Sequence, residues 1–146
     1  MITSDEKFLL NRMNSVSNKV QLGTLVDRCK NVVKATYDVA SSGGTVGDKL
    51  LGVKIPSGAI VTRVFYKILT AFTSTGNNGT LALKLQSAGD LLAAVDADTL
   101  AGIGSGIPDN AVANMLSLTA EREVTATVAT NALLTGKVDI FVEYVV

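Results

Sequence analysis

Four aspartates in one loop-rich stretch are the residues best suited to chemistry. Asp90, Asp96, Asp98 and Asp109 offer carboxylate oxygens, which hard cations such as calcium bind when several are clustered. A carboxylate-dependent hydrolase would also need at least two such carboxylates. Their spacing matches no calcium-binding loop, so we expect solvated surface acids and neither a metal site nor a catalytic site.

A glycine-rich segment, Gly102-Ile103-Gly104-Ser105-Gly106, has part of the pattern of a phosphate-binding loop. The full dinucleotide pattern requires a glycine at position 107 and a helix directly afterwards. This sequence has Ile107 there, followed by Pro108. We therefore expect a flexible surface loop within a longer irregular stretch over 102–113, and no bound nucleotide or other cofactor.

Histidine is absent, and Cys29 is the only cysteine. The absence excludes the Ser-His-Asp and Cys-His nucleophile systems and the usual zinc sites. Cys29 is predicted to be a small buried or interface residue. The sequence thus favours a protein that is not an enzyme. A carboxylate-dependent enzyme is the least favoured alternative, since it would need two acids with shifted pKa values in one cleft.

The composition points to a protein that is partly covered by partners. The 146 residues carry 13 basic and 13 acidic side chains, so a net charge of zero provides no field to attract nucleic acid or an anionic membrane. Charged residues make up 18% of the chain, and the mean hydropathy is +0.36. No apolar run approaches the roughly 20 residues of a membrane-spanning helix.

The first part of the chain, residues 1–32, is predicted to be a helical or extended arm. Thr3 and Glu6 form a capping box that begins a helix over 3–20. The apolar stripe of that helix consists of Leu9, Met13, Val16 and Val20. Its other face is rich in Asn and Ser, which are weak helix formers, so we expect the arm to need a partner. The four stripe residues are therefore predicted interface residues.

From residue 33 the apolar pattern alternates instead. Strands are predicted over 33–39, 51–55, 60–70, 81–86, 115–119, 124–129 and 137–146. Asn78-Gly79 predicts a tight turn, and 91–101 could hold a helical turn or a strand end. Short strands with turn signals and no intervening long helix predict one mainly β domain over 33–146, an antiparallel sandwich or barrel.

Two of these strands are apolar on both faces. In the third strand, Ile60, Val64, Tyr66 and Ile68 are expected on one face, and Val61, Phe65 and Leu69 among charged residues on the other. The last strand likewise has Phe141 and Val145 among its polar positions. Strands of this kind are usually covered on both faces. We predict Phe65, Leu69, Phe141 and Val145 as an oligomer or capsid interface; cover by another part of the same chain is the alternative.

Three runs of residues resemble small structural proteins of tailed-bacteriophage heads. They are Lys34–Ala40, Leu51–Pro56 with Ala59–Tyr66, and the ending Leu133–Val146. The resemblance covers roughly residues 34–146. It implies a capsid decoration, or cement, protein with a jelly-roll-like β-sandwich and an N-terminal arm.

The same resemblance implies partners and a location. The protein would be made in the host cytoplasm and bind the major capsid protein on the outside of the virion. It would act as a homo-oligomer, a trimer in preference to a dimer. A head-fibre or tail-associated adhesin module that binds a host surface is the main alternative.

Overall fold

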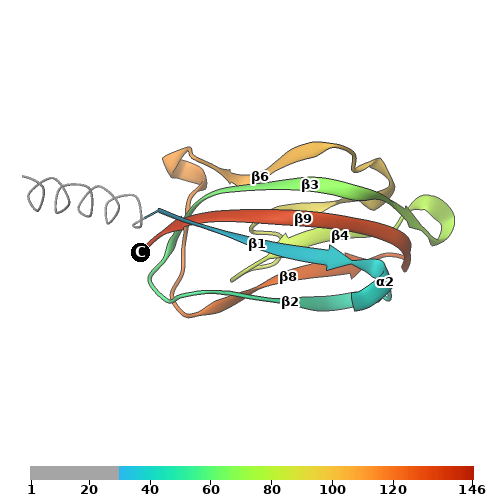
Figure 1. The fold of residues 1–146 in the computed structure, drawn as a ribbon, viewed down its shortest axis with the longest axis horizontal. Helices are drawn as coiled ribbons and strands as arrows, with labels where there is room; N and C mark the ends of the chain where they lie inside the picture. Colours follow the sequence, from blue (N-terminus) through green and yellow to red (C-terminus); the bar gives the residue numbers. More distant parts are fainter. Residues whose placement is uncertain (1–29) are drawn as a thin grey trace, which may run out of the picture. The chain divides into compact units, whose positions relative to one another are not determined.

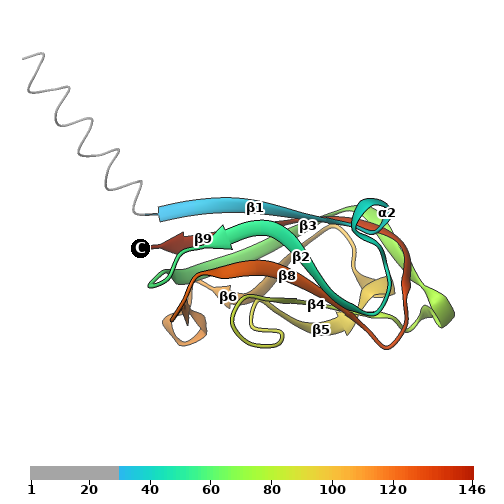
Figure 2. The ribbon, with the colours of Figure 1, turned by 90° about the horizontal axis from the view of Figure 1, so that it is seen from below.

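The computed structural model describes residues 30–146, which form two antiparallel β-sheets packed face to face (Figures 1 and 2). Sheet 1 contains, in spatial order, β1 (Lys30–Asp38), β9 (Leu133–Val145), β3 (Ile60–Ser74) and β6 (Ile103–Asp109), with the short β7 (Leu116–Ser117) also paired to β3. Sheet 2 contains β2 (Gly47–Ile55), β8 (Arg122–Ala129), β4 (Thr80–Lys84) and β5 (Leu92–Asp96). The predicted mainly β sandwich is confirmed.

Short helical segments link several of the strands. They are α2 (Val39–Ser42) and the 3₁₀ turns η1 (Thr75–Asn77), η2 (Ala97–Thr99) and η3 (Val112–Asn114). The helix predicted over 3–20, with Leu9, Met13, Val16 and Val20, lies outside the described residues, as does Cys29.

The strand pairs are nested along the chain. β4 pairs with β5, β3 with β6, β2 with β8, and β1 with β9, so each pair encloses the previous one in sequence. A long hairpin rolled into two layers has the same nesting. This arrangement places β3 and β9, the two longest strands, side by side in the middle of sheet 1 (Figure 1).

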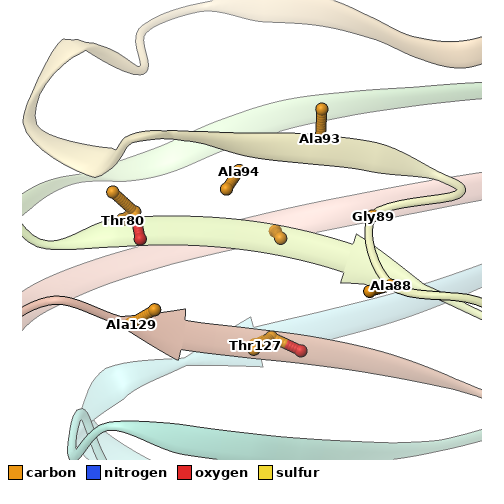
Figure 3. A pocket seen from close by; sticks show the side chains of 8 residues that line it. Thr80, Ala88, Gly89, Ala93, Ala94, Thr127 and Ala129 are labelled. Carbon is orange, nitrogen blue, oxygen red and sulfur yellow. The ribbon is translucent and has the colours of Figure 1, made fainter.

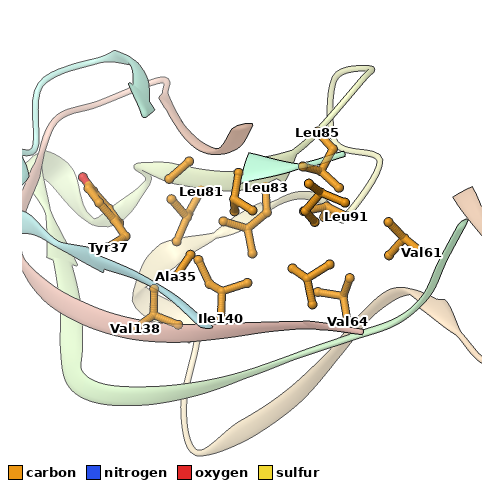
Figure 4. Close-up of a cluster of buried hydrophobic side chains, with 14 of the residues drawn as sticks. Ala35, Tyr37, Val61, Val64, Leu81, Leu83, Leu85, Leu91, Val138 and Ile140 are labelled. Atoms are coloured by element: carbon orange, nitrogen blue, oxygen red, sulfur yellow. The ribbon is translucent and has the colours of Figure 1, made fainter. Parts of the chain in front are cut away.

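The core lies between the sheets and follows the alternation of the strands. Sheet 1 contributes Ala35, Tyr37, Val64, Val138 and Ile140, and the opposite layer contributes Leu81 and Leu83 (Figure 4). All seven are at most 2% exposed. Burying a large aliphatic side chain stabilises the fold by about 1.5–3 kcal/mol, so this shared layer holds the sandwich together.

One prediction about β3 is wrong, because the strand contains an irregularity. Val61 is fully buried and Ile60 is 40% exposed, the reverse of the expected faces. Val61 pairs with Tyr144 and Arg63 with Glu143, so two steps along β3 match one step along β9. An extra residue of this kind moves every side chain on one side of it to the opposite face.

The predicted loop over 102–113 is also wrong in its first half, which is the edge strand β6. Two of its glycines lie where neighbouring groups leave no space for a side chain. A Cβ on Gly104 would lie 2.2 Å from the ring of Tyr66, and one on Gly106 would lie 2.3 Å from the carbonyl oxygen of Leu91. These glycines permit close packing in a strand and do not mark a flexible loop.

The turn predicted at Asn78-Gly79 does not join two paired strands. β3 continues to Ser74, and the chain then crosses from sheet 1 to β4 in sheet 2. Gly79 is buried at this crossing, where a Cβ would approach the side chain of Ser74 to 2.6 Å. Positive φ values occur earlier, at Gly76 and Asn77.

The buried hydroxyl of Tyr37 is expected to make the fold less stable at high pH. Its hydroxyl donates a hydrogen bond of 2.8 Å to the carbonyl oxygen of Gly43, and desolvation by burial raises the pKa of Tyr37 from 10.0 to about 12. The folded state thus disfavours the ionised phenolate. The contribution of protonated Tyr37 to the free energy of unfolding is fully present below pH 10. It is lost as the pH rises toward 12.

Urea unfolding between pH 9 and about 12 tests this expectation. Over that window the intact chain should lose more stability than Tyr37→Phe, because every other side chain is common to both proteins. Parallel pH profiles for the two proteins would contradict the prediction.

Candidate assembly interface

The outer face of sheet 1 carries an unusual mixture of apolar and charged side chains. Alternate residues of β3 and β9 point inward to the core, which leaves the others on the outside. The outward set in the centre of the sheet is Ile60, Arg63, Phe65, Lys67, Leu69, Lys137, Asp139, Phe141, Glu143 and Val145. We call this set the outer face.

A stacked aromatic pair lies at the centre of the outer face. Phe65 and Phe141 are partners in the register of β3 and β9, and their ring centroids are 4.9 Å apart with an interplanar angle of 12°. The guanidinium carbon of Arg63 lies 5.1 Å from the centroid of the Phe65 ring. Both rings keep part of their surface exposed, so they form an apolar centre that a partner can cover.

Opposite charges flank this aromatic pair on both sides. Arg63 is the register partner of Glu143, and Lys67 is the partner of Asp139. Opposite charges directly across neighbouring strands stabilise a sheet by about 0.2–1 kcal/mol each. The β3 side of the pair is therefore basic and the β9 side is acidic.

The neighbouring strands continue this pattern of charge. On β1, the hydroxyl of Thr36 donates to Asp139 Oδ1 at 2.7 Å, and Lys34 Nζ lies 3.5 Å from Asp139 Oδ2. On β6, Asp109 is the register partner of Arg63. Hydrogen bonds from the Asn114 side chain and the Ala111 N–H lower the pKa of Asp109, which keeps it ionised near neutral pH.

The structure brings the predicted body residues onto one face. Phe65 and Phe141 are in contact, as the stacking shows. Val145 pairs with Ile60 at the start of β3, and Leu69, which is 45% exposed, lies near its other end. The predicted inner face of the last strand is confirmed for Val138, Ile140, Val142 and Tyr144, whereas Val146 follows the end of β9 and is 75% exposed.

The four aspartates of the loop-rich stretch accept hydrogen bonds from nearby groups. Asp109 is exposed to solvent as expected, and Asp90, Asp96 and Asp98 are partly buried. The Asp90 carboxylate accepts hydrogen bonds from the N–H groups of Leu85, Gln86 and Ser87 at 2.7–2.8 Å. Asp96 and Asp109 accept from N–H groups two residues later.

Asp98 accepts from both the N–H and the hydroxyl of Ser74, which connects the 3₁₀ turn η2 to the end of β3. Among residues 30–146 there is no group of three or more His, Cys, Asp or Glu that could hold a metal ion.

Two shallow depressions offer little for catalysis. One, of about 290 Å³, lies on the outer side of sheet 2 and is lined by small residues and two hydroxyls: Thr80, Ala82, Ala88, Gly89, Ala93, Ala94, Thr127 and Ala129 (Figure 3). The other, of about 370 Å³, has Asp38 and Lys137 as its ionisable residues. Neither depression contains the pair of acids that a carboxylate-dependent hydrolase would require.

No helix in the described part of the chain is long and apolar enough to cross a membrane. No protein-family model and no curated protein matches this sequence.

Solved structures with a similar fold include chains from the capsids of three bacteriophages. A chain in the acid-stable capsid of Helicobacter pylori bacteriophage KHP30 is 17% identical, with a TM-score of 0.58, over 80% of this chain and 87% of that one. A chain of the cyanophage Pam1 capsid is 20% identical, with a TM-score of 0.58, over 80% and 84%. A chain of the Ralstonia phage GP4 capsid is 17% identical, with a TM-score of 0.50, over 79% and 84%. The protein therefore shares its fold with chains found in phage capsids.

Proposed function

We propose that this protein is a structural component of a tailed-bacteriophage virion, a decoration protein that binds the outside of the capsid. The observation that carries the proposal is the shared fold with chains of three phage capsids, over about four-fifths of this chain. The nested strand pairs support a jelly-roll-like form of the sandwich, an architecture common in viral capsid proteins.

The outer face supports an assembly role. The stacked phenylalanine rings stabilise the sheet as a cross-strand pair, and they also leave apolar surface exposed beside Arg63. Interfaces are typically built around aromatic and arginine residues that become buried on assembly. Leu69 and Val145 extend the apolar surface toward both ends of the strands. In our proposal, Phe65, Leu69, Phe141 and Val145 contact another subunit.

The proposed mechanism is mechanical. The body forms an oligomer through the outer face, and the part of the predicted arm that precedes β1 binds the major capsid protein through Leu9, Met13, Val16 and Val20. An oligomer with several arms engages neighbouring capsomers at once. Because later arms bind at a high effective concentration, this bridging strengthens attachment without any new contact. The particle is stabilised because neighbouring capsomers are tied together.

Reconstitution on phage heads that lack this protein tests the proposal. We expect the purified chain to bind such heads saturably, to appear as density on the exterior in cryo-electron microscopy, and to raise the temperature at which the heads open. Bovine serum albumin at the same concentration serves as the control for non-specific attachment. Density at fibre tips or on the tail would instead support the adhesin alternative, and an absence of binding would contradict both.

A further inference from the structure

The charges of the outer face are arranged in stripes that follow the strands. β3 contributes the bases Arg63 and Lys67, and its neighbour β9 contributes the acids Asp139 and Glu143. At the two edges of the sheet, β1 adds the base Lys34 and β6 adds the acid Asp109. From β1 to β6, the sign of the charge therefore alternates from strand to strand. Two residues are exceptions: the base Lys137, which lies in the first half of β9 beside Thr70, and the acid Asp38 at the end of β1.

This order of stripes selects one geometry for a second copy of the chain. In the aligned class of face-to-face packing, two sheets keep their strand directions within about 30° of each other. A two-fold axis in the plane of the interface must then run either parallel or perpendicular to the strands. These two choices place different charges opposite each other.

A perpendicular axis through the aromatic pair places each strand over its own copy. Arg63 would then face Lys67 of the second copy, and Glu143 would face Asp139 of the second copy. Both contacts join like charges, which are unfavourable across an interface. This geometry is disfavoured.

A parallel axis between β3 and β9 places each of these strands over the other strand of the second copy. Arg63 then faces Glu143 of the second copy, and Phe65 faces Phe141. Lys67 lies over Asp139, which is only 9% exposed and already accepts a hydrogen bond from Thr36. The contact of Arg63 with Glu143 is therefore the main charge contact.

The charges of the edge strands do not meet in this geometry, because Lys34 lies at the height of Asp139 and Asp109 lies at the height of Arg63. The complementarity of charge therefore comes from the two central strands, β3 and β9.

We propose that two copies of this chain pack face to face through the outer face, about a two-fold axis parallel to β3 and β9. The proposal rests on the assembly role proposed above for this face, and it names the partner as a second copy. Each contact occurs twice, as a two-fold interface requires.

The size of the face is sufficient for such a dimer. Four strands about 4.8 Å apart, with outward residues about 6.7 Å apart along four positions, span about 500 Å² per copy. The total of about 1,000 Å² is near the lower limit for a specific interface. We therefore expect a dimer that dissociates on dilution.

A pair of charge-reversal variants tests the geometry. Arg63→Glu places two acids opposite each other in a variant homodimer, and Glu143→Arg places two bases opposite each other. By sedimentation, each variant alone should dimerise at least about tenfold more weakly than the intact chain.

An equimolar mixture of the two variants should recover the dimer. The acid introduced by Arg63→Glu in one copy then faces the base introduced by Glu143→Arg in the other copy. The unchanged Glu143 of the first variant likewise faces the unchanged Arg63 of the second. Circular dichroism and thermal melting show whether each variant is folded.

A matched pair controls for net charge. Lys54 and Glu121 form an ion pair of 3.9 Å in which both side chains are 62% exposed, and neither belongs to the outer face. Lys54→Glu and Glu121→Arg repeat the same changes in charge, and both should dimerise like the intact chain.

Three results would overturn the proposal. They are a monomeric or trimeric intact chain at all concentrations, stronger dimerisation of either single variant, or a mixture that stays as weak as its components. Stronger single variants would indicate the perpendicular axis. None of these results depends on capsid binding, so the decoration role can stand or fail separately.

Discussion

Gly44→Ala is expected to lower the free energy of unfolding by about 3 kcal/mol, the upper part of the range for an overpacked site. A Cβ on Gly44 would lie 1.8 Å from the carbonyl oxygen of Leu133. The N–H of Leu133 also donates to the Gly44 carbonyl at 2.7 Å, which ties the segment after α2 to the start of β9. Because the obstructing atom belongs to the backbone, it cannot rotate away as a side chain could. Urea unfolding of the variant measures the loss.

Gly102→Ala is the matched control for this effect. Gly102 has a φ of +61°, but a Cβ there would meet nothing within 4 Å. Its substitution should therefore cost only the backbone strain, about 1 kcal/mol. If Gly44→Ala cost no more than Gly102→Ala, the close approach of Leu133 would not be a determinant of stability.

Strands with strict alternation were predictable from the sequence. Val138, Ile140, Val142 and Tyr144 alternate with polar or exposed positions, and all four are buried as expected. In β1, Ala35 and Tyr37 behave in the same way, and so does Val39, which follows β1 at the start of α2. In a regular strand with one face on the core, every second side chain is buried, so the alternation of apolar residues indicates directly which ones they are.

Two features of the fold depend on contacts that a local pattern does not contain. The irregularity after Val61 exchanges the faces of Ile60 and Val61, and only the pairing with β9 reveals it. The strand β6 looks like a loop because Gly104 and Gly106 are weak strand formers. Only the folded structure shows that Tyr66 and the Leu91 carbonyl oxygen pack so closely against these glycines that a side chain has no space.

The candidate interface was predictable in its apolar part. Phe65 and Phe141 occupy positions that strand alternation assigns to the solvent side of the sheet. Large apolar side chains at such positions indicate a surface that a partner covers. The charge stripes were not predictable, because Arg63 opposite Glu143 and Lys67 opposite Asp139 depend on strand register. Register between distant strands is set by the whole sheet, and the local sequence does not specify it.

The acidic residues show the same dependence on context. Asp90 resembles a solvated loop acid in the sequence, yet its carboxylate holds three consecutive N–H groups of the turn between β4 and β5. An aspartate close to a glycine and a serine is a common turn stabiliser. That local chemistry was available in the sequence as an alternative to calcium binding.

Removal of residues 1–22 is expected to abolish binding to the capsid while the β-sandwich stays folded. The apolar stripe of Leu9, Met13 and Val16 is the proposed anchor. Each large apolar side chain that a partner buries contributes about 1.5–3 kcal/mol to the free energy of binding. Two arms on one dimer multiply the effect, because loss of both arms removes the bridging as well as the individual contacts. The expected loss of affinity is therefore at least about a thousandfold, or about 4 kcal/mol.

A substitution series separates the anchor from the mere length of the arm. Leu9→Asn with Met13→Asn should weaken binding to phage heads nearly as much as the deletion does. Asn11→Ser with Asn14→Ser changes the opposite side of the predicted helix and should leave binding unchanged. Co-sedimentation with heads measures affinity, and circular dichroism and thermal melting follow the body. If the truncated protein bound as tightly as the intact chain, the capsid contact would have to lie on the body and not on the arm.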